Sequence, residues 1–480
     1  MIDPSGPRQI TLLRGLARGQ FAWFVIVVTI WSAWLLFLPI DPDYTAGELL
    51  DHLMGWMDTG ALYPALGEGP TLKVLNYPPL VFVLARGLTS LGLPALLAGR
   101  LVNGLGVALL ILTLSLWMRA RGARGSMLLG SVGLLGASFP VIYGAGQFHV
   151  EIWAALGTAA GFALADQGRG ARQLQLAGMV LALGCFAKQT QVVPAAVCLL
   201  WMALHRREEM KAAFLGFVVT GVVGASAISL GAGPEAWRHM LGYTVGTFSP
   251  MNLGWQLLSH AAPWLLLLLV AGWRGLSREA GARSDPAWWY WCAAMLWSLS
   301  AVRKGSGYPY FLDLHLATVV WVGPFVFGPA MDRLAGWPRR ILPWALAVQI
   351  IGANVGVAVA VGLNLDRLRL MDAHLEDLCA QFDASGVVLT EEAGLARACG
   401  RTPAAHPFIM TSLAAQGLWD PSAFEASVAS GRFGPALVPF DPRLPVKGAH
   451  ADRWTEPVRA AFAEAPSVEA HPSGWWVVRW

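Results

Sequence analysis

The sequence predicts an all-α polytopic membrane protein, with about eleven transmembrane helices, surface helices in the first outer loop and a small α/β domain at the C-terminal end. Of its 480 residues, 55% are hydrophobic and only 13% are charged, about half the charged fraction of an ordinary soluble domain. Apolar runs recur from residue 21 to residue 362. The more polar tail has roughly 115 residues, which suffices for a small domain of strands and helices.

The apolar runs can be assigned in chain order. The first follows three arginines and lacks a small-residue cleavage site, so we expect it to remain as an uncleaved span after a cytoplasmic segment, 1–20. The expected spans are 21–40, 97–118, 126–145, 150–166, 174–187, 191–204, 212–232, 261–273, 286–302, 312–330 and 341–362. Together they form a membrane domain, 21–362, whose first outer loop, 41–96, should carry the surface helices.

The stretch 79–94 is apolar enough to cross, but it begins with Pro78-Pro79 and contains Arg86. If it lies at the surface, the basic clusters all fall on one side of the membrane, as the positive-inside rule requires. These clusters are Arg8/Arg14/Arg18, Arg119/Arg121/Arg124, Arg169/Arg172, Arg206/Arg207/Lys211, Arg274/Arg278/Arg283 and Arg333/Arg339/Arg340. We therefore expect a cytoplasmic N-terminus and a C-terminal domain, 365–480, on the outside.

Acidic side chains then gather on the outer face. Asp41 and Asp43 directly follow the first span, and a second outer turn holds His149 and Glu151. Either aspartate could simply cap a surface helix at Thr45–Met57, because Asp favours helix starts. Three further acidic residues of this loop are expected to be solvated positions on that helix: Glu48, Asp51 and Asp58.

Cations on the outer face call for a reason, because the same rule disfavours them there. Lys188 could snorkel from a span end, but phosphate binding would explain it together with Arg303 and Lys304, since Arg and Lys both bind phosphate oxygens. The following Gly305-Ser306-Gly307 could let backbone N–H groups approach an anion. The net charge of +4 gives no reason to expect a nucleic-acid partner.

Several outer motifs stand in an order typical of one family. They are Gly60-Ala61-Leu62-Tyr63-Pro64, Tyr77-Pro78-Pro79-Leu80, Gly99-Arg100-Leu101, Phe186-Ala187-Lys188-Gln189-Thr190 and Tyr308-Pro309-Tyr310-Phe311. From residue 21 to about 330 the chain resembles the GT-C superfamily of integral-membrane glycosyltransferases, in particular the bacterial relatives of protein O-mannosyltransferases and of lipid A aminoarabinose transferase. The resemblance implies a bacterial cytoplasmic membrane protein that uses a polyprenyl-phosphate-linked sugar as donor.

The resemblance also implies roles for residues. The catalytic base would be Asp43, or Asp41, and Glu151 would be a second carboxylate, although this chain has His149-Val150-Glu151 where an aspartate is usual. Tyr77 stands where relatives place a basic residue, so Lys73 could substitute for it. The donor phosphate would then contact Lys188, Arg303, Lys304 and Lys73, in a substrate pocket that also includes Tyr77, His149, Gln189, Tyr308 and Tyr310.

The predicted reaction is transfer of the sugar to a hydroxyl on the outer face, by one inverting displacement. The acceptor would be a glycolipid, a polysaccharide or a protein, and membrane lipid would be a further partner. A divalent metal is the less favoured addition, with Asp41, Asp43, His149 and Glu151 as its ligands. The alternatives are a transporter or flippase of lipid-linked sugar precursors, or a non-catalytic binding protein with the same fold.

The five cysteines divide by location. Three fall in or near spans, where they are expected to be plain core residues: Cys185, Cys198 and Cys292. Cys379 and Cys399 lie in the outer tail, where disulfides can form, and we expect them to pair.

Overall fold

The computed structural model describes residues 6–41, 43–66, 72–243, 246–277, 281–334, 336–382, 386–446 and 448–480. Arg278 of the basic clusters and residues 1–5 of the predicted cytoplasmic segment lie outside these ranges. The helices before the tail are α1 (Gly6–Phe37), α2 (Tyr44–Thr59), α3 (Leu80–Ser90), α4 (Ala95–Ala120), α5 (Gly125–Gly133), α6 (Phe139–Gly144), α7 (Glu151–Gln167), α8 (Ala171–Ala187), α9 (Val192–His205), α10 (Arg207–Trp237), α11 (Pro250–Gln256), α12 (Leu265–Leu276), α13 (Pro286–Ser298), α14 (Leu312–Val326) and α15 (Gly336–Ala373).

Helices occur at every predicted span, but their lengths differ widely. Within the described residues, six helical stretches are long and apolar enough to cross a membrane: 15–37, 95–120, 207–242, 250–276, 308–326 and 338–373. The remaining predicted spans correspond to shorter helices, among them α7, α8 and α9. The protein is therefore a mostly helical chain with several apolar helices, and the count of eleven spans stays a prediction.

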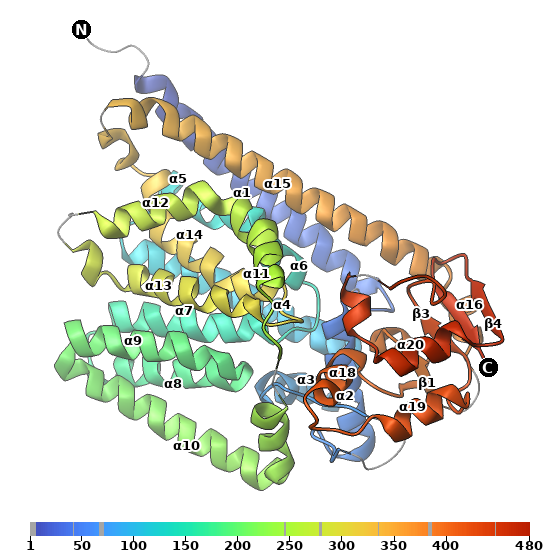
Figure 1. Ribbon diagram of the computed structural model, residues 1–480. Helices are drawn as coiled ribbons and strands as arrows, with labels where there is room; N and C mark the ends of the chain where they lie inside the picture. Colours follow the sequence, from blue (N-terminus) through green and yellow to red (C-terminus); the bar gives the residue numbers. More distant parts are fainter. Residues whose placement is uncertain are drawn as a thin grey trace.

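Two long helices from opposite ends of the sequence, α1 and α15, run side by side (Figure 1). Gln20 and Asn354 exchange side-chain hydrogen bonds of 2.9 and 2.6 Å between them. Interhelical amide bonds of this kind satisfy polar groups that lipid cannot. The pairing fixes where α1 ends and therefore where the acidic pair that follows it lies.

The antiparallel helices α7 and α8 pack closely through glycine. A Cβ atom on Gly157 would lie 2.5 Å from the Cα atom of Gly184, so only glycine permits this approach. As a result, the first residue of α7, Glu151, and the residue that follows α8, Lys188, lie at the same end of the pair. Packing within the helix bundle thus brings together two charges from separate turns.

The stretch 79–94 contains the short helix α3. Its 11 residues extend only about 17 Å at 1.5 Å per residue, well short of a bilayer core of about 30 Å. Other short apolar helices, such as α9, fall at predicted spans, so the surface placement of this segment stays a prediction.

The tail contains a five-stranded sheet with the order β2-β1-β3-β5-β4, in which β1 is parallel to β2 and β3, and β5 is antiparallel to β3 and β4. Its elements are α16 (Leu375–Ala380), β1 (Val387–Thr390), α17 (Ala393–Ala398), β2 (Thr402–Pro403), α18 (Pro407–Ala415), α19 (Ser422–Ala429), β3 (Ala436–Val438), α20 (Glu456–Ala463), β4 (Ser467–Ala470) and β5 (Trp476–Arg479). We call this part the C-terminal domain. The sulfur atoms of Cys379 and Cys399 are bonded, with their Cα atoms 5.1 Å apart, which links α16 to the end of α17.

The C-terminal domain covers α2 (Figure 1). A Cβ atom on Gly47 would lie 2.7 Å from the backbone nitrogen of Gly394 in α17, so the two segments meet backbone to backbone. The expectation that Asp51 is a solvated position is wrong, because its side chain is fully buried beneath this domain. Asp58, near the far end of α2, has a side chain that is 61% exposed, as expected.

Candidate active site

The segment that carries Asp41 and Asp43 is held by a buried arginine. Arg100, near the start of α4, donates from its guanidinium to the carbonyl oxygens of Leu38 and Ile40, each at 2.6 Å, and to that of Leu35. The carbonyls of Leu38 and Ile40 lie beyond the end of α1, where helix hydrogen bonding leaves carbonyls without partners. That of Leu35, in the last turn, also accepts from the Leu38 N–H at 3.2 Å. Arg100 therefore fixes the chain immediately before the acidic pair. Sequence reasoning used it only as part of a motif, although a buried arginine in an apolar helix is itself a functional signal.

Asp43 is the N-cap residue of α2. Its Oδ1 accepts hydrogen bonds from the backbone N–H groups of Thr45 (2.8 Å) and Ala46 (3.2 Å). The capping function expected from the sequence is thus present. The side chain is 17% exposed, and Oδ1 also lies 3.6 Å from Nε2 of His149. In the described residues no hydrogen bond reaches Oδ2, so one carboxylate oxygen remains available to a ligand.

His149 lies between two carboxylates. Its Nε2 is 3.1 Å from Oε1 of Gln147, and its Nδ1 is 3.3 Å from Oε2 of Glu151. The orientation of the Gln147 amide is set by its own hydrogen bond to the Tyr143 carbonyl oxygen, at 2.9 Å. Nδ1 faces a carboxylate and Nε2 faces the Gln147 amide oxygen, and both of these oxygens accept hydrogen bonds.

The charge on His149 follows from its surroundings. Burial opposes the charged form, but the contact with Glu151 and the charge of Asp43 raise the pKa of the ring above its usual value. The surroundings therefore favour the protonated form of the ring. Sequence reasoning assigned no function to Gln147, which lies against the ring.

Glu151 and Lys188 complete a row of alternating charges. Nζ of Lys188 donates to Oε1 of Glu151 at 2.8 Å, and both side chains are at least nine-tenths buried. We call Asp43, His149, Glu151 and Lys188 the charged row. A paired arrangement of this kind is what allows four charges to remain buried together.

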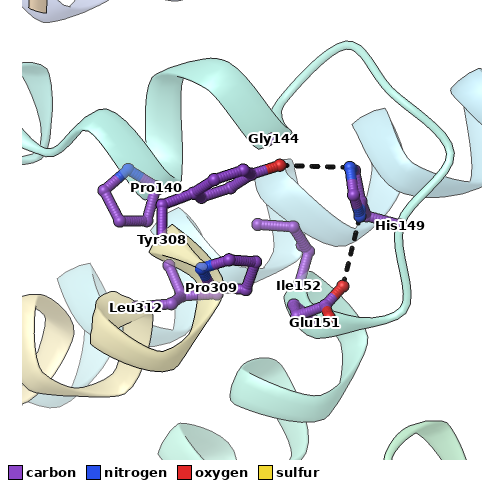
Figure 2. Close-up of a pocket in the computed structure, with 8 residues that line it drawn as sticks. All are labelled: Pro140, Gly144, His149, Glu151, Ile152, Tyr308, Pro309 and Leu312. Carbon is purple, nitrogen blue, oxygen red and sulfur yellow. Dashed lines mark hydrogen bonds and ion pairs between the residues drawn. The ribbon is translucent and has the colours of Figure 1, made fainter. Parts of the chain in front are cut away.

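Aromatic side chains surround the charged row. Lys188 Nζ lies 4.9 Å from the ring centre of Tyr310 and 5.7 Å from that of Tyr77, within the range of cation–π attraction. The Tyr308 hydroxyl lies 3.1 Å from Nε2 of His149. Figure 2 shows a pocket at this point, lined by Pro140, Gly144, His149, Glu151, Ile152, Tyr308, Pro309 and Leu312.

Asp41 differs from Asp43 in its environment. It is 5% exposed, and neither carboxylate oxygen has a hydrogen-bond partner. Burial, partly offset by the charge of Arg100, raises the pKa of Asp41 to about 6. Gly394 of the C-terminal domain is close to it, since a Cβ atom there would lie 3.7 Å from Cβ of Asp41.

Three of the predicted phosphate-binding cations lie apart from the charged row. Lys73 Nζ is bound to Asp51 at 2.8 Å, and Lys304 Nζ pairs with Asp452 of the C-terminal domain at 3.2 Å. Arg303 is exposed. Across the described ranges, neither Arg303 nor Lys304 forms an ion pair with a member of the row. Their binding of phosphate stays a prediction.

Two other predicted features have structural contacts. The Gln189 amide donates to the carbonyl oxygens of Asn76 (2.7 Å) and Met240 (3.1 Å). These bonds connect the first outer loop to the segment that contains Met240. Gly305 adopts a φ of 78°, and a Cβ atom there would lie 2.1 Å from the ring of Phe408. The glycine turn therefore packs against the C-terminal domain, and the Ser306 N–H is already bound to the Arg303 carbonyl oxygen at 3.1 Å.

The predicted metal ligands do not form a metal site in this geometry. Both nitrogens of His149 face other side chains, and Asp41 is buried beside them. Among the residues that the structure describes, no group of three or more His, Cys, Asp or Glu side chains is arranged to hold a metal ion.

Solved structures with the same fold are known. Two are of ArnT from Cupriavidus metallidurans, in the apo state and bound to undecaprenyl phosphate, with TM-scores of 0.64 and 0.63 and identities of 12% and 13%, each over 95% of this chain and 97% of that chain. A third is the archaeal oligosaccharyltransferase AglB from Archaeoglobus fulgidus in complex with an inhibitory peptide and a dolichol-phosphate, with a TM-score of 0.54 and 12% identity over 95% of this chain and 74% of that chain. No family model and no curated protein sequence matches the chain.

ArnT, a lipid A aminoarabinose transferase, and AglB both belong to the GT-C superfamily. The similarity extends through the C-terminal domain, since it covers 95% of the chain. The resemblance predicted from the motifs is thereby confirmed at the level of the fold. The chain has the fold of the GT-C superfamily of membrane glycosyltransferases.

Proposed function

We propose that this protein transfers a sugar from a polyprenyl-phosphate-linked donor to a hydroxyl of an acceptor on the outer face of the bacterial cytoplasmic membrane. The acceptor would be a glycolipid, a polysaccharide or a protein. The observation that carries the proposal is the charged row, in which a partly open carboxylate and a buried ammonium stand at opposite ends of one continuous line of contacts. Sugar transfer from a phospholipid requires both groups.

Asp43 is the proposed base. Its Oδ1 is fixed by two backbone N–H groups while Oδ2 is free to accept the acceptor's proton. Asp41 is less suited, because it is buried and its pKa is raised to about 6. The sequence left the base open between Asp41 and Asp43, and we therefore propose Asp43.

Lys188 is the proposed contact to the leaving phosphate. An ammonium has three donors, and Glu151 uses one of them, so two remain for phosphate oxygens. Charge on the phosphate grows as the glycosidic bond breaks, and a cation placed there favours the transition state over the ground state. Arg303 and Lys304 remain candidate contacts on approach, but Lys73 is already bound by Asp51.

His149 and Glu151 are proposed to keep the row ionised. A protonated His149 between Asp43 and Glu151 offsets the repulsion of the two carboxylates. In its protonated form the ring cannot accept the acceptor's proton, which leaves that step to Asp43. Asp43, the more open of the two carboxylates, can then favour the oxocarbenium character that the anomeric carbon gains.

The bond changes balance in one step. A bond forms between the acceptor oxygen and the anomeric carbon while the bond from that carbon to the phosphate oxygen breaks. The acceptor's proton passes to Asp43, and the electron pair leaves with the polyprenyl phosphate. A single displacement inverts the anomeric configuration.

Lipid binding tests the proposal. The protein should co-purify with a polyprenyl phosphate, free or sugar-linked, detectable by mass spectrometry of the extracted lipid, and it should bind added undecaprenyl phosphate more tightly than undecaprenol. A protein that binds neither lipid, or both equally, would contradict the donor assignment. A transporter of lipid-linked sugars would bind the lipid too, but it would release no glycosylated acceptor and would tolerate Asp43→Asn.

A further inference from the structure

The C-terminal domain contacts one whole face of α2. The contacting residues Tyr44, Gly47, Asp51 and Asp58 are spaced by three, four and seven, which places them on the same side of a helix. The Tyr44 hydroxyl accepts a hydrogen bond from the Phe408 N–H at 3.0 Å. Asp43, the N-cap of this helix, directly precedes the contact face.

Asp51 is the centre of this contact. Its fully buried carboxylate binds Nε of Arg397 at 2.6 Å and Nε2 of His406 at 2.8 Å, both from the C-terminal domain, as well as Lys73 at 2.8 Å from the outer loop. Arg397 also lies 3.6 Å from Asp58. We call Asp51, Lys73, Arg397 and His406 the Asp51 cluster.

The same domain also contacts the turn that leads to Tyr308. Phe408 packs against Gly305, and Asp452 pairs with Lys304 at 3.2 Å. Tyr308 in turn lies 3.1 Å from His149. The domain therefore touches both outer segments that converge on His149, one through α2 and the other through this turn.

From these contacts we infer that the C-terminal domain positions Asp43 for the reaction, with Arg397 and His406 as positioning residues that act through Asp51. The inference rests on the proposed function, in which Asp43 is the base. Asp51 lies eight residues beyond Asp43, about 12 Å along the helix, so neither Arg397 nor His406 touches the substrate. A helix transmits the constraint because its backbone is rigid, and a shift of about 1 Å at a reacting group can cost on the order of 100-fold in rate.

Arg397→Met and His406→Asn in the full-length protein test the inference. Arg443→Met is the matched control, because Arg443 belongs to the same domain but pairs with Asp441 two residues away and lies half-exposed. Transfer is measured with the polyprenyl-phosphate lipid fraction extracted from host membranes, and binding with undecaprenyl phosphate. Amide hydrogen exchange at Thr45 and Ala46, whose N–H groups Asp43 caps, reports the position of Asp43 independently of activity.

We expect Arg397→Met and His406→Asn to lower kcat by about 100-fold, to leave undecaprenyl phosphate binding unchanged and to speed exchange at Thr45 and Ala46. Arg397→Lys should restore part of kcat, since it keeps the charge. Wild-type kcat in both variants, or loss of lipid binding together with kcat, would overturn the inference. If Asp43→Asn is itself silent, the proposed function fails and this inference fails with it, whereas a silent Arg397→Met beside an inactive Asp43→Asn overturns the inference alone.

Discussion

The charged row and the Asp51 cluster are two groups of charged side chains, and each includes an aspartate from the start or the middle of α2. They differ in how many of their polar atoms already have partners. Asp51 is fully buried and has three partners, the cations Lys73 and Arg397 and the ring of His406. Asp43 keeps a side chain that is 17% exposed, and Lys188 at the other end of the row has Glu151 as its ion-pair partner. A cluster whose polar atoms all have partners can only stabilise the structure. A row with unused hydrogen-bond donors and acceptors can also bind a substrate and act on it.

Asparagine substitution at the two aspartates should separate these functions most strongly. Asp43→Asn removes the proposed base and should lower transfer by about 10²–10⁴-fold. The fold should survive, because Asn caps helices about as well as Asp. Turnover and thermal unfolding of the same preparation are the measurements. Normal turnover in this variant would remove Asp43 from the mechanism.

Asp51→Asn, unlike Asp43→Asn, should lower the stability of the fold. Removing this charge leaves the buried Lys73 and Arg397 without their anionic partner, which typically costs about 3–5 kcal/mol. Burial opposes ionisation of Asp51, but His406, Lys73 and Arg397 together hold its pKa well below the usual range. Its contribution is therefore present above pH of about 4 and is lost as the pH falls below it. Unfolding midpoints in detergent from pH 7 downward should decline in the wild type and change less in the variant.

Replacing one lysine in each group sharpens the comparison. Lys188→Met should lower kcat by about 10²–10³-fold and weaken undecaprenyl phosphate binding. Lys73→Met should leave that binding unchanged, because Lys73 is held by Asp51. Glu151→Gln combined with Lys188→Met controls for the carboxylate left unpaired. Equal loss of lipid affinity in both lysine variants would indicate that Lys73 also contacts the donor phosphate.

The link between Cys379 and Cys399 braces α17, which carries Arg397 and so supports the Asp51 cluster. Cys379→Ser should lower the unfolding free energy of the C-terminal domain by about 3 kcal/mol. Thiol labelling of unfolded, unreduced protein should modify three cysteines, namely Cys185, Cys198 and Cys292. Labelling of all five without reductant would show that the bond is absent.

Asp41→Asn is expected to have the smallest effect. The buried carboxyl has a pKa of about 6, so the folded protein binds its proton more tightly than the unfolded chain does. Wild-type stability should fall as the pH rises from about 4 to about 6, by at most about 3 kcal/mol. The variant should lack this fall and unfold at a higher temperature than the wild type above pH 6. A loss of transfer as large as that of Asp43→Asn would instead make Asp41 the base.

Much of the fold and part of the site were predictable from local sequence. Apolar runs specify membrane helices because lipid requires each segment to satisfy its own backbone hydrogen bonds. Asp43 followed by a helix-forming segment specifies a cap, and the short run Val387–Thr390 in the tail is typical of a strand. These features depend on neighbours within a few residues. The order of motifs was sufficient to indicate the GT-C fold.

The tertiary structure decided which charges meet. Asp51 and Arg397 are 346 residues apart, and nothing near Asp51 in the sequence distinguishes it from the exposed Asp58. Likewise, Glu151 and Lys188 meet because glycines let α7 and α8 approach closely. Whether a charged side chain is solvated, saturated or left partly open depends on the elements packed around it, and that packing is a property of the whole fold.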